Sequence, residues 1–381
     1  MTHIPQVRPA VAQVVAEAAR FADEELAPNG GVWERERRQP EDVLRRAIRA
    51  FTDVGIPEEL GGRGLGLSTV MQYYEELAAR DLGFTCALAV HNAVTIAATV
   101  IPDRNLMDLC LPRLMSGQAI GAFSLTEPTA GSDAGAIGCQ AVPTSEGYLL
   151  NGRKAWVTSG CNADLFLTFL QSDPSQRAKG IIGLVVDRDT SGLTTSPPLA
   201  LIGSHAMGTT DLEFTDAVVP ADRLAFGPGK GFSAALSGID VARTGVAAMC
   251  NGALAGALDA ATHYATSRHA FGQRVFDNQG IQFPLADVAT ALEASRALTQ
   301  RAANLMDAGE PATVAAAHAK KFATKAAFDG ISQCIQVFGA NGIKEDTGLG
   351  RQLASVRICA FMDGTSEILN LVIARAMDAN T

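Results

Sequence analysis

The run Ile181-Ile182-Gly183-Leu184-Val185-Val186 is short and almost entirely apolar, which is typical of a buried β-strand. Short runs of the same kind occur nearby, at 120–125, 148–150 and 165–170. Turn signals such as Asn151-Gly152 separate them. Together these runs predict a β domain over residues 119–225.

Helical patterns flank this β region on both sides. Before it, over residues 1–118, apolar residues recur at helical spacing, as in Val11, Val14, Val15 and Ala18. After it, over residues 226–381, the Ala-rich sequence predicts long helices at Phe232–Ala270, Gln279–Asp307 and Pro311–Gly339. We therefore expect an α+β multi-domain fold: an N-terminal helical domain, a central antiparallel β domain and a C-terminal four-helix bundle. A doubly wound α/β fold is excluded, because strands and helices do not alternate.

Composition narrows the function classes. The chain has 381 residues, 47% of them hydrophobic, and a net charge of −9, so a large core is expected and a basic nucleic-acid surface is not. No apolar run is long enough to span a membrane, and the first residues lack a leader pattern, so a cytoplasmic location is expected. The seven cysteines and six histidines are scattered without zinc-site spacing, so no metal site is expected.

The stretch 122–133 is the most informative one for chemistry. It takes a predicted strand into a loop of small residues with hydroxyls at Thr126 and Ser132. Such a loop suits a flat polar ligand, because its hydroxyls and backbone N–H groups can bond the ligand's edge. An ordinary strand-to-turn exit, capped by Ser132 and Asp133, is the alternative. The residues alone leave both interpretations open.

Five segments, taken in order, resemble the signatures of the acyl-CoA dehydrogenase family. They are Thr126-Glu127-Pro128 to Gly131-Ser132-Asp133, Lys154 to Thr158, Arg268 to Gly272 with Gln279 to Gln282, Gln336 to Gly342, and Asp363 to Ile368. Each segment is moderately specific, but the five in family order are strongly so. Together with the predicted order of helical, β and helical regions, the resemblance extends over about residues 60–375.

The resemblance implies an FAD enzyme that forms homotetramers or homodimers. Its reaction would be α,β-dehydrogenation of an acyl thioester, either acyl-CoA or an acyl-carrier protein. A carboxylate would take the α-proton while the β-hydrogen leaves as hydride to flavin N5. Electrons would then pass to an electron-transfer flavoprotein or to oxygen. The departures at His205, Met207 and Met362 suggest a specialised substrate, such as a carrier-bound acyl group.

The resemblance also implies the site residues. FAD would contact Phe123, Leu125, Thr126, Gly131, Ser132, Trp156, Thr158, Arg268, Phe271, Gln279, Gln336, Gly339, Thr365 and Glu367. The acyl thioester would contact Ser132, Asp240, Arg243 and Gly364. Five of the FAD residues would reach its pyrophosphate and adenosine end, partly from a neighbouring subunit: Arg268, Phe271, Gln279, Gln336 and Gly339.

Simpler roles remain open for five of these positions. Trp156 could be a core aromatic, and Arg268 a surface charge at a helix end. Asp240 and Arg243, spaced i, i+3, could form an intrahelical ion pair. Thr365 could serve only to cap the last helix.

Asp363 is the predicted base. The family's usual residue at this motif position is Glu, and Asp is shorter by one methylene, about 1.5 Å of reach. The alternative base position beside Arg243 is Ala242, which has no carboxylate. Asp363 could instead cap the helix that follows it. In that case the protein would be a flavin-dependent oxygenase or oxidase that keeps the fold and has lost the base.

Overall fold

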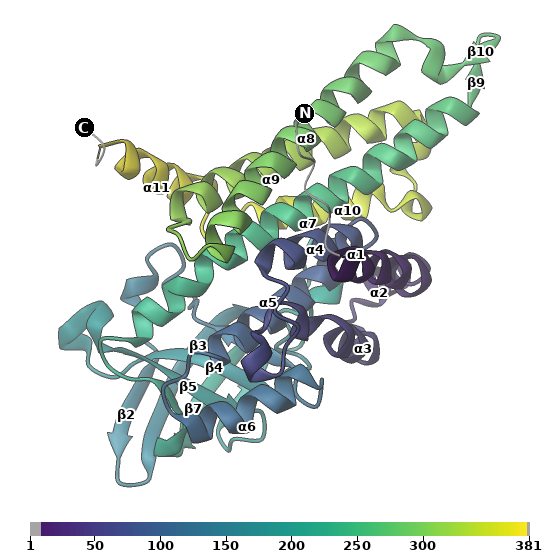
Figure 1. Ribbon diagram of the computed structural model, residues 1–381. Coiled ribbons are helices and arrows are strands. Elements are labelled where there is room, and N and C mark those ends of the chain that lie inside the picture. The colour runs from purple at the N-terminus through teal and green to yellow at the C-terminus, as the bar shows by residue number, and fades with distance from the viewer. Residues whose placement is uncertain (1–8, 379–381) are drawn as a thin grey trace.

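The computed structural model describes residues 9–378 and confirms the predicted fold class. N-terminal helices, a β domain and a bundle of long helices follow one another along the chain (Figure 1). The N-terminal helices are α1 (Pro9–Phe21), α2 (Gly30–Glu36), α3 (Glu41–Phe51), α4 (Leu67–Ala78), α5 (Leu82–Ala98) and α6 (Arg104–Met115). Aspartates begin the last two of these: Asp81 accepts a hydrogen bond from Phe84 N at 2.9 Å, and Asp103 caps α6 in the same way.

The β domain is one eight-stranded sheet in the order β6-β7-β3-β2-β4-β5-β8, with β1 beside β4. Its strands are β1 (Gly121–Ser124), β2 (Gln140–Thr144), β3 (Gly147–Val157), β4 (Leu165–Gln171), β5 (Ile181–Asp187), β6 (Leu193–Thr195), β7 (Thr210–Val219) and β8 (Leu224–Phe226). Pairing is mainly antiparallel, but β1 runs parallel to β4. This is possible because a long connection separates the two strands in sequence. β4 is buried along its whole length, and β5 along all but its last residue, which explains their continuous apolar sequence.

Long helices form the C-terminal bundle. They are α7 (Gly231–Ser267), α8 (Gln279–Asp307), α9 (Thr313–Phe338), α10 (Leu349–Cys359) and α11 (Ser366–Asp378). The first predicted helix ends three residues early, because Arg268 is extended and a short hairpin of β9 (His269–Ala270) and β10 (Gln273–Arg274) follows. The third begins at Thr313, two residues later than predicted.

Glycine lets α7 approach the N-terminal helices closely. A Cβ added at Gly252 would lie 2.1 Å from the carbonyl oxygen of Glu75 in α4, and one at Gly256 would meet Ala79 at 2.4 Å. At these two glycines the backbone of α7 therefore lies directly against the backbone at the end of α4, because glycine has no side chain to hold them apart. α7 runs from the edge of the β domain to the β9–β10 hairpin at the opposite extremity (Figure 1).

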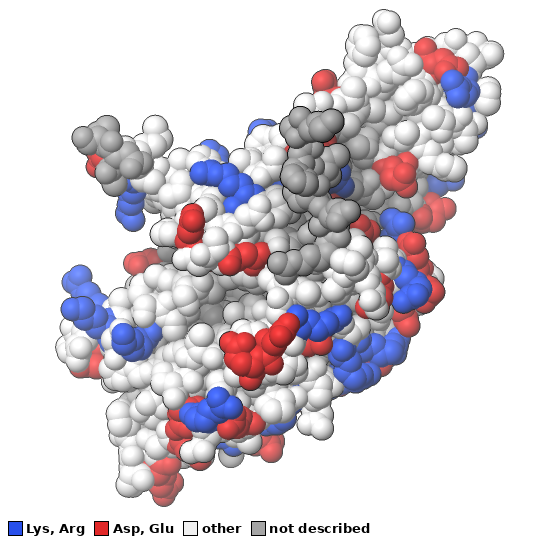
Figure 2. Space-filling view, viewed as in Figure 1, with Lys and Arg blue, Asp and Glu red and all other residues white. Residues whose placement is uncertain are grey.

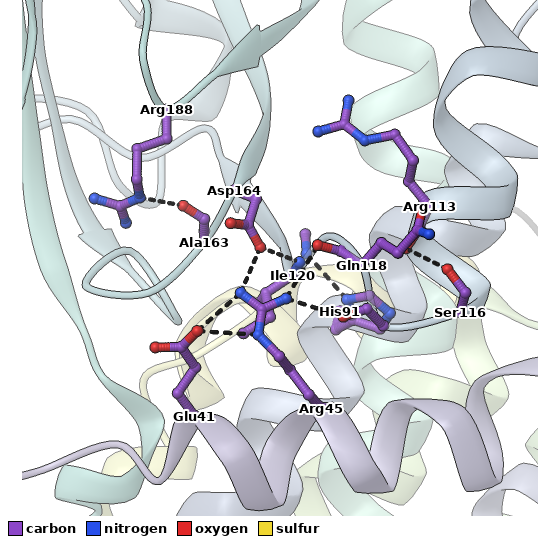
Figure 3. A network of polar contacts seen from close by, with 12 residues as sticks. Glu41, Arg45, His91, Arg113, Ser116, Gln118, Ile120, Ala163, Asp164 and Arg188 are labelled. Carbon is purple, nitrogen blue, oxygen red and sulfur yellow. Dashed lines mark hydrogen bonds and ion pairs between the residues drawn. The ribbon is translucent and has the colours of Figure 1, made fainter.

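A polar network fixes where β1 begins (Figure 3). Arg45 of α3 donates to the Asp164 carboxylate at 2.9 Å, and the same carboxylate accepts from Ile120 N at 2.8 Å. The next amide, Gly121 N, donates to Nδ1 of the buried His91 at 3.0 Å. Burial lowers the pKa of His91 to about 3, so the ring stays neutral and can accept this bond. The network thereby anchors the strand that leads into the 122–133 stretch.

The surface carries charges of both signs. Figure 2 shows Lys and Arg on one face in separate groups that alternate with Asp and Glu. Among residues 9–378, no helix has both the length and the apolar content needed to cross a bilayer.

Candidate active site

The site centres on a turn between α10 and α11. Asp363 and Gly364 both adopt left-handed backbone conformations, with φ of +49° and +94°. Arg243 of α7 donates through Nε to the Asp363 carbonyl oxygen at 3.0 Å. Lys320 of α9 donates through Nζ to the Gly364 carbonyl oxygen at 2.7 Å. Side chains from two bundle helices thus hold two consecutive carbonyls of this turn.

The Asp363 carboxylate is free to act on a ligand. It is only partly exposed and, within the described chain, accepts no hydrogen bond. Burial raises its pKa, although the charges of Lys320 and Arg243 counteract that shift. A raised pKa suits a general base, because base strength rises with it.

Thr365, not Asp363, caps the last helix. Its hydroxyl accepts from Ile368 N at 3.5 Å, and its carbonyl accepts from Leu369 N at 3.0 Å. A hydrogen bond with Thr365 also lowers the pKa of Glu367 in the first turn. The capping role considered for Asp363 therefore belongs to Thr365.

Asp240 and Arg243 do form the intrahelical ion pair that the spacing allows. Arg243 Nη1 lies 3.2 Å from Asp240 Oδ1, and the Thr313 hydroxyl donates to Asp240 Oδ2 at 2.5 Å. Since Arg243 also binds the Asp363 carbonyl, the pair reaches the turn directly. The structure thus brings together four of the predicted residues: Asp240, Arg243, Asp363 and Gly364.

A second group gathers where β1 and β3 end. Ala155 N donates to the Thr126 carbonyl at 2.8 Å, and Lys154 Nζ donates to the Leu125 carbonyl at 3.0 Å. Lys154 also pairs with Glu127 at 2.7 Å. These contacts place the predicted Leu125 and Thr126 beside the strand that carries Trp156. Phe123 packs on Phe169, with ring centroids 5.1 Å apart.

Trp156 is not a core aromatic. It has a left-handed backbone, with φ of +61°, and its residue is 61% exposed. Gly131 and Ser132 of the neighbouring loop are also exposed, and a Cβ on Gly131 would meet nothing within 4 Å. Thr158 is buried. An exposed indole beside an open, hydroxyl-bearing loop fits a flat aromatic ring such as isoalloxazine.

A third group lies at the far end of α7. Arg268 follows that helix directly, and Phe271 is fully exposed in the hairpin, with Gln279 opening α8. Gln336 and Gly339 belong to the same end, because the neighbouring Phe338 stacks on Tyr264 with centroids 4.3 Å apart. Arg268 comes 25 residues after Arg243 in the sequence, about 37 Å along the helix. Within one chain this group does not meet the Asp363 turn.

Sequence reasoning missed Lys320 altogether. The residue is 0% exposed and sits in the Ala-rich face of α9. No motif marks it; a lysine surrounded by alanines on a buried face was the one available signal. In the described part of the chain, no cluster of three or more His, Cys, Asp or Glu side chains is placed to hold a metal.

Comparison with known proteins places the chain in a family. Residues 9–118, 122–217 and 229–378 match the N-terminal, middle and C-terminal domains of acyl-CoA dehydrogenase. An acyl-CoA dehydrogenase of Bacillus subtilis is 32% identical over 381 residues, covering all of both chains.

Two solved structures show the same architecture. Butyryl-CoA dehydrogenase from Megasphaera elsdenii has a TM-score of 0.94 at 29% identity, covering 97% of this chain and 98% of that one. The prolyl acyl carrier protein oxidase AnaB has a TM-score of 0.92 at 25% identity, covering 97% and 99%. The chain belongs to the acyl-CoA dehydrogenase family of FAD-binding flavoprotein oxidoreductases.

Proposed function

We propose that this protein catalyses α,β-dehydrogenation of an acyl thioester, with Asp363 as the base that takes the α-proton. The observation that supports this most directly is the state of the Asp363 carboxylate. Among residues 9–378, no group donates a hydrogen bond to it, its pKa is raised by burial, and Arg243 holds its backbone. A carboxylate in this state can accept a proton near neutral pH once it has ionised.

The second group of residues would hold the flavin. Leu125, Thr126 and Ser132 would bond the ring's edge through backbone and hydroxyl groups, and Trp156 would cover its face. Phe123, Gly131, Thr158, Thr365 and Glu367 would complete this end of the FAD site. Bound FAD supplies the acceptor for the β-hydride. The protein's own part is to keep water out and to hold the substrate between the ring and Asp363.

The first group of residues would hold the thioester. Asp240 and Arg243 would contact its thiol arm, with Ser132 and Gly364 on either side. The backbone N–H of Asp363 would bond the thioester carbonyl and so make the α-carbon more acidic. Because Arg243 fixes the adjoining carbonyl, this N–H is kept in a defined direction.

The third group implies a site shared between subunits. Arg268, Phe271, Gln279, Gln336 and Gly339 are exposed and lie at the opposite end of α7 from the Asp363 turn, so they would reach the pyrophosphate and adenosine of a neighbour's FAD. We therefore propose a homo-oligomer, a tetramer or dimer, in the cytoplasm. The electron acceptor would be an electron-transfer flavoprotein or oxygen. The thiol carrier would be CoA or an acyl-carrier protein, since the chain aligns almost fully with a relative named for each.

Anaerobic bleaching of the flavin tests this proposal. Acyl-CoA and acyl-carrier thioesters of varied chain length are mixed with the holoprotein, and loss of flavin absorbance is followed. We expect at least one thioester to bleach the wild type, and none to bleach the Asp363→Asn variant at a comparable rate. Equal bleaching of both would refute the assigned base. Dependence on an external flavin reductase would favour the oxygenase alternative.

A further inference from the structure

Lys320 is a buried cation with an unusual partner. Its side chain is fully removed from solvent, yet its hydrogen bond among the described residues goes to a neutral acceptor, the Gly364 carbonyl, at 2.7 Å. An ammonium group is costly to bury unless it is paired with an opposite charge or well hydrogen-bonded. A lysine retained at such a position on α9 therefore calls for a role beyond packing.

The partner of Lys320 adjoins the partner of Arg243. Arg243, from α7, binds the carbonyl of Asp363, and Lys320, from α9, binds the carbonyl of Gly364. Both residues of the turn have positive φ, a conformation that residues other than glycine adopt rarely. Two cations from separate helices thus hold a backbone shape that Asp363 would not prefer by itself.

The negative charge of the Asp363 carboxylate also acts on Lys320. The charged and titratable groups around its ammonium are Asp363 from the turn, Cys359 from α10, and Cys250 and Arg243 from α7. Asp363 is the one carboxylate among them. Burial lowers the pKa of Lys320 and raises that of Asp363, and each charge counteracts the shift of the other.

We infer that Lys320 is a positioning residue for proton abstraction: it fixes the Asp363–Gly364 turn and its charge favours the ionised carboxylate. This inference rests on the proposed function of Asp363. Lys320 would touch neither substrate nor flavin. Its effect would pass through the turn, so it should change the rate and its pH dependence more than the binding of thioester or FAD.

Two substitutions separate the two parts of this role. Lys320→Met removes both the donor and the charge, and Lys320→Gln keeps a donor on a shorter, neutral side chain. Lys321→Met, at the exposed neighbouring position on α9, is the matched control. Single-turnover flavin reduction is measured from acid to alkaline pH, and deuterium exchange of the peptide covering 360–366 is measured in the absence of thioester.

We expect Lys320→Met to slow flavin reduction by about 10- to 100-fold, since a displacement of about 1 Å at a reacting group has an effect of that size. The acid limb of its pH profile should move to higher pH, because a cation that favours ionised Asp363 is gone. Lys320→Gln should show the same movement with a smaller loss of rate. Exchange at 360–366 should accelerate most in Lys320→Met, less in Lys320→Gln, which keeps a donor, and stay unchanged in Lys321→Met.

The outcomes are distinguishable. If Lys320→Met keeps the wild-type rate, pH profile and local exchange while Asp363→Asn is inactive, the inference about Lys320 is wrong and the base stands. If Asp363→Asn still bleaches, the base assignment fails and takes the Lys320 role with it. Should Lys320→Met not fold, Lys320→Gln decides: a wild-type acid limb in that variant overturns the inference.

Discussion

Lys154 and Glu127 form an ion pair almost completely removed from solvent, with Nζ 2.7 Å from Oε1 and side-chain exposures of 0% and 6%. Glu127 also accepts from the amides of Gly138 and Cys139, at 2.7 and 2.9 Å. Lys154 reaches back to the Leu125 carbonyl. The pair thus closes the loop that would hold the flavin, joining its beginning, its end and the adjoining strand.

Removing one partner of this pair should cost both stability and FAD. Lys154→Met would leave Glu127 buried and unpaired, for which about 3–5 kcal/mol of destabilisation is typical. Urea unfolding and the flavin-to-protein absorbance ratio measure the two effects. Lys325→Met, which breaks a surface pair with Asp329, should cost below about 0.5 kcal/mol. The coupling would be contradicted if the loss in the free energy of unfolding of the Lys154→Met/Glu127→Gln double variant equalled the sum of the losses in the two single variants.

Asp363→Asn should stabilise the protein while it strongly reduces turnover. Because the folded-state pKa of Asp363 lies above its ordinary value, the ionised side chain disfavours folding at neutral pH, and this cost disappears as the pH falls through the raised pKa. We expect a higher melting temperature than wild type at pH 7 and convergence of the two in acid. Turnover should fall by about 10²- to 10⁴-fold. A lower melting temperature at pH 7 would contradict the raised pKa.

His91 should contribute to loss of stability in acid. Its folded-state pKa of about 3 lies below the ordinary value of about 6.5, so the unfolded chain binds the proton and stability falls as the pH drops from 6.5 towards 3. Between pH 7 and pH 5 this one group accounts for about 2 kcal/mol. His91→Asn keeps an acceptor for Gly121 N–H but does not titrate. Denaturant unfolding at the two pH values should show a smaller decline in the variant, and parallel declines would refute the assignment.

Trp156 should report FAD binding by its accessibility. The other tryptophan, Trp33, is 3% exposed and stacks on Phe84, so single-tryptophan chains separate the two emitters. In the apoprotein, iodide should quench Trp33→Phe, which retains Trp156, and FAD should protect it. Trp156→Phe should be quenched little in either state. Trp156→Ala should bind FAD at least about 10-fold more weakly, given the area of an indole. Unprotected emission in the holoprotein would place the ring elsewhere.

A mixture of two inactive variants should regain activity if the FAD site is shared between chains. Asp363→Asn lacks the proposed base, and Arg268→Ala lacks the proposed phosphate contact at the far end of α7. In a mixed oligomer, a site that takes Asp363 from one chain and Arg268 from the other is intact. Co-refolded chains should therefore bleach with thioester, whereas either variant alone does not. No recovery, despite mixed oligomers by mass spectrometry, would argue for sites complete within one chain.

The fold could be predicted from the sequence where local patterns decide it. Strands such as β5 are apolar because they are buried, and the helices of the bundle show in their Ala-rich runs. The end of α7 was misplaced because the β9–β10 hairpin, and not propensity, draws Arg268 out of the helix. The parallel pairing of β1 with β4 was also missed, since it depends on contacts between distant segments.

The site was predictable only where a motif marks it. Asp363, Asp240 and Arg243 come from such patterns, and the structure places them together. Lys320 has no motif, because its importance arises only where α9 meets the turn in space. The sequence could not decide whether Trp156 is a core residue or an exposed one. Its exposure goes with a left-handed backbone conformation near the end of the strand, and neither composition nor hydrophobic periodicity predicts that conformation.

The length of α7 limits which insertions and deletions the chain can accept between Arg243 and Arg268. This 37-residue helix separates Arg243 from Arg268 as a rigid spacer. Deleting one residue between them would retract the hairpin by about 1.5 Å and swing it through about 100°. A seven-residue deletion would nearly restore its direction but withdraw it by about 10 Å. Insertions and deletions in this interval should therefore be tolerated far less than equally exposed loop insertions, because each of them would move Arg268 and the hairpin relative to Arg243.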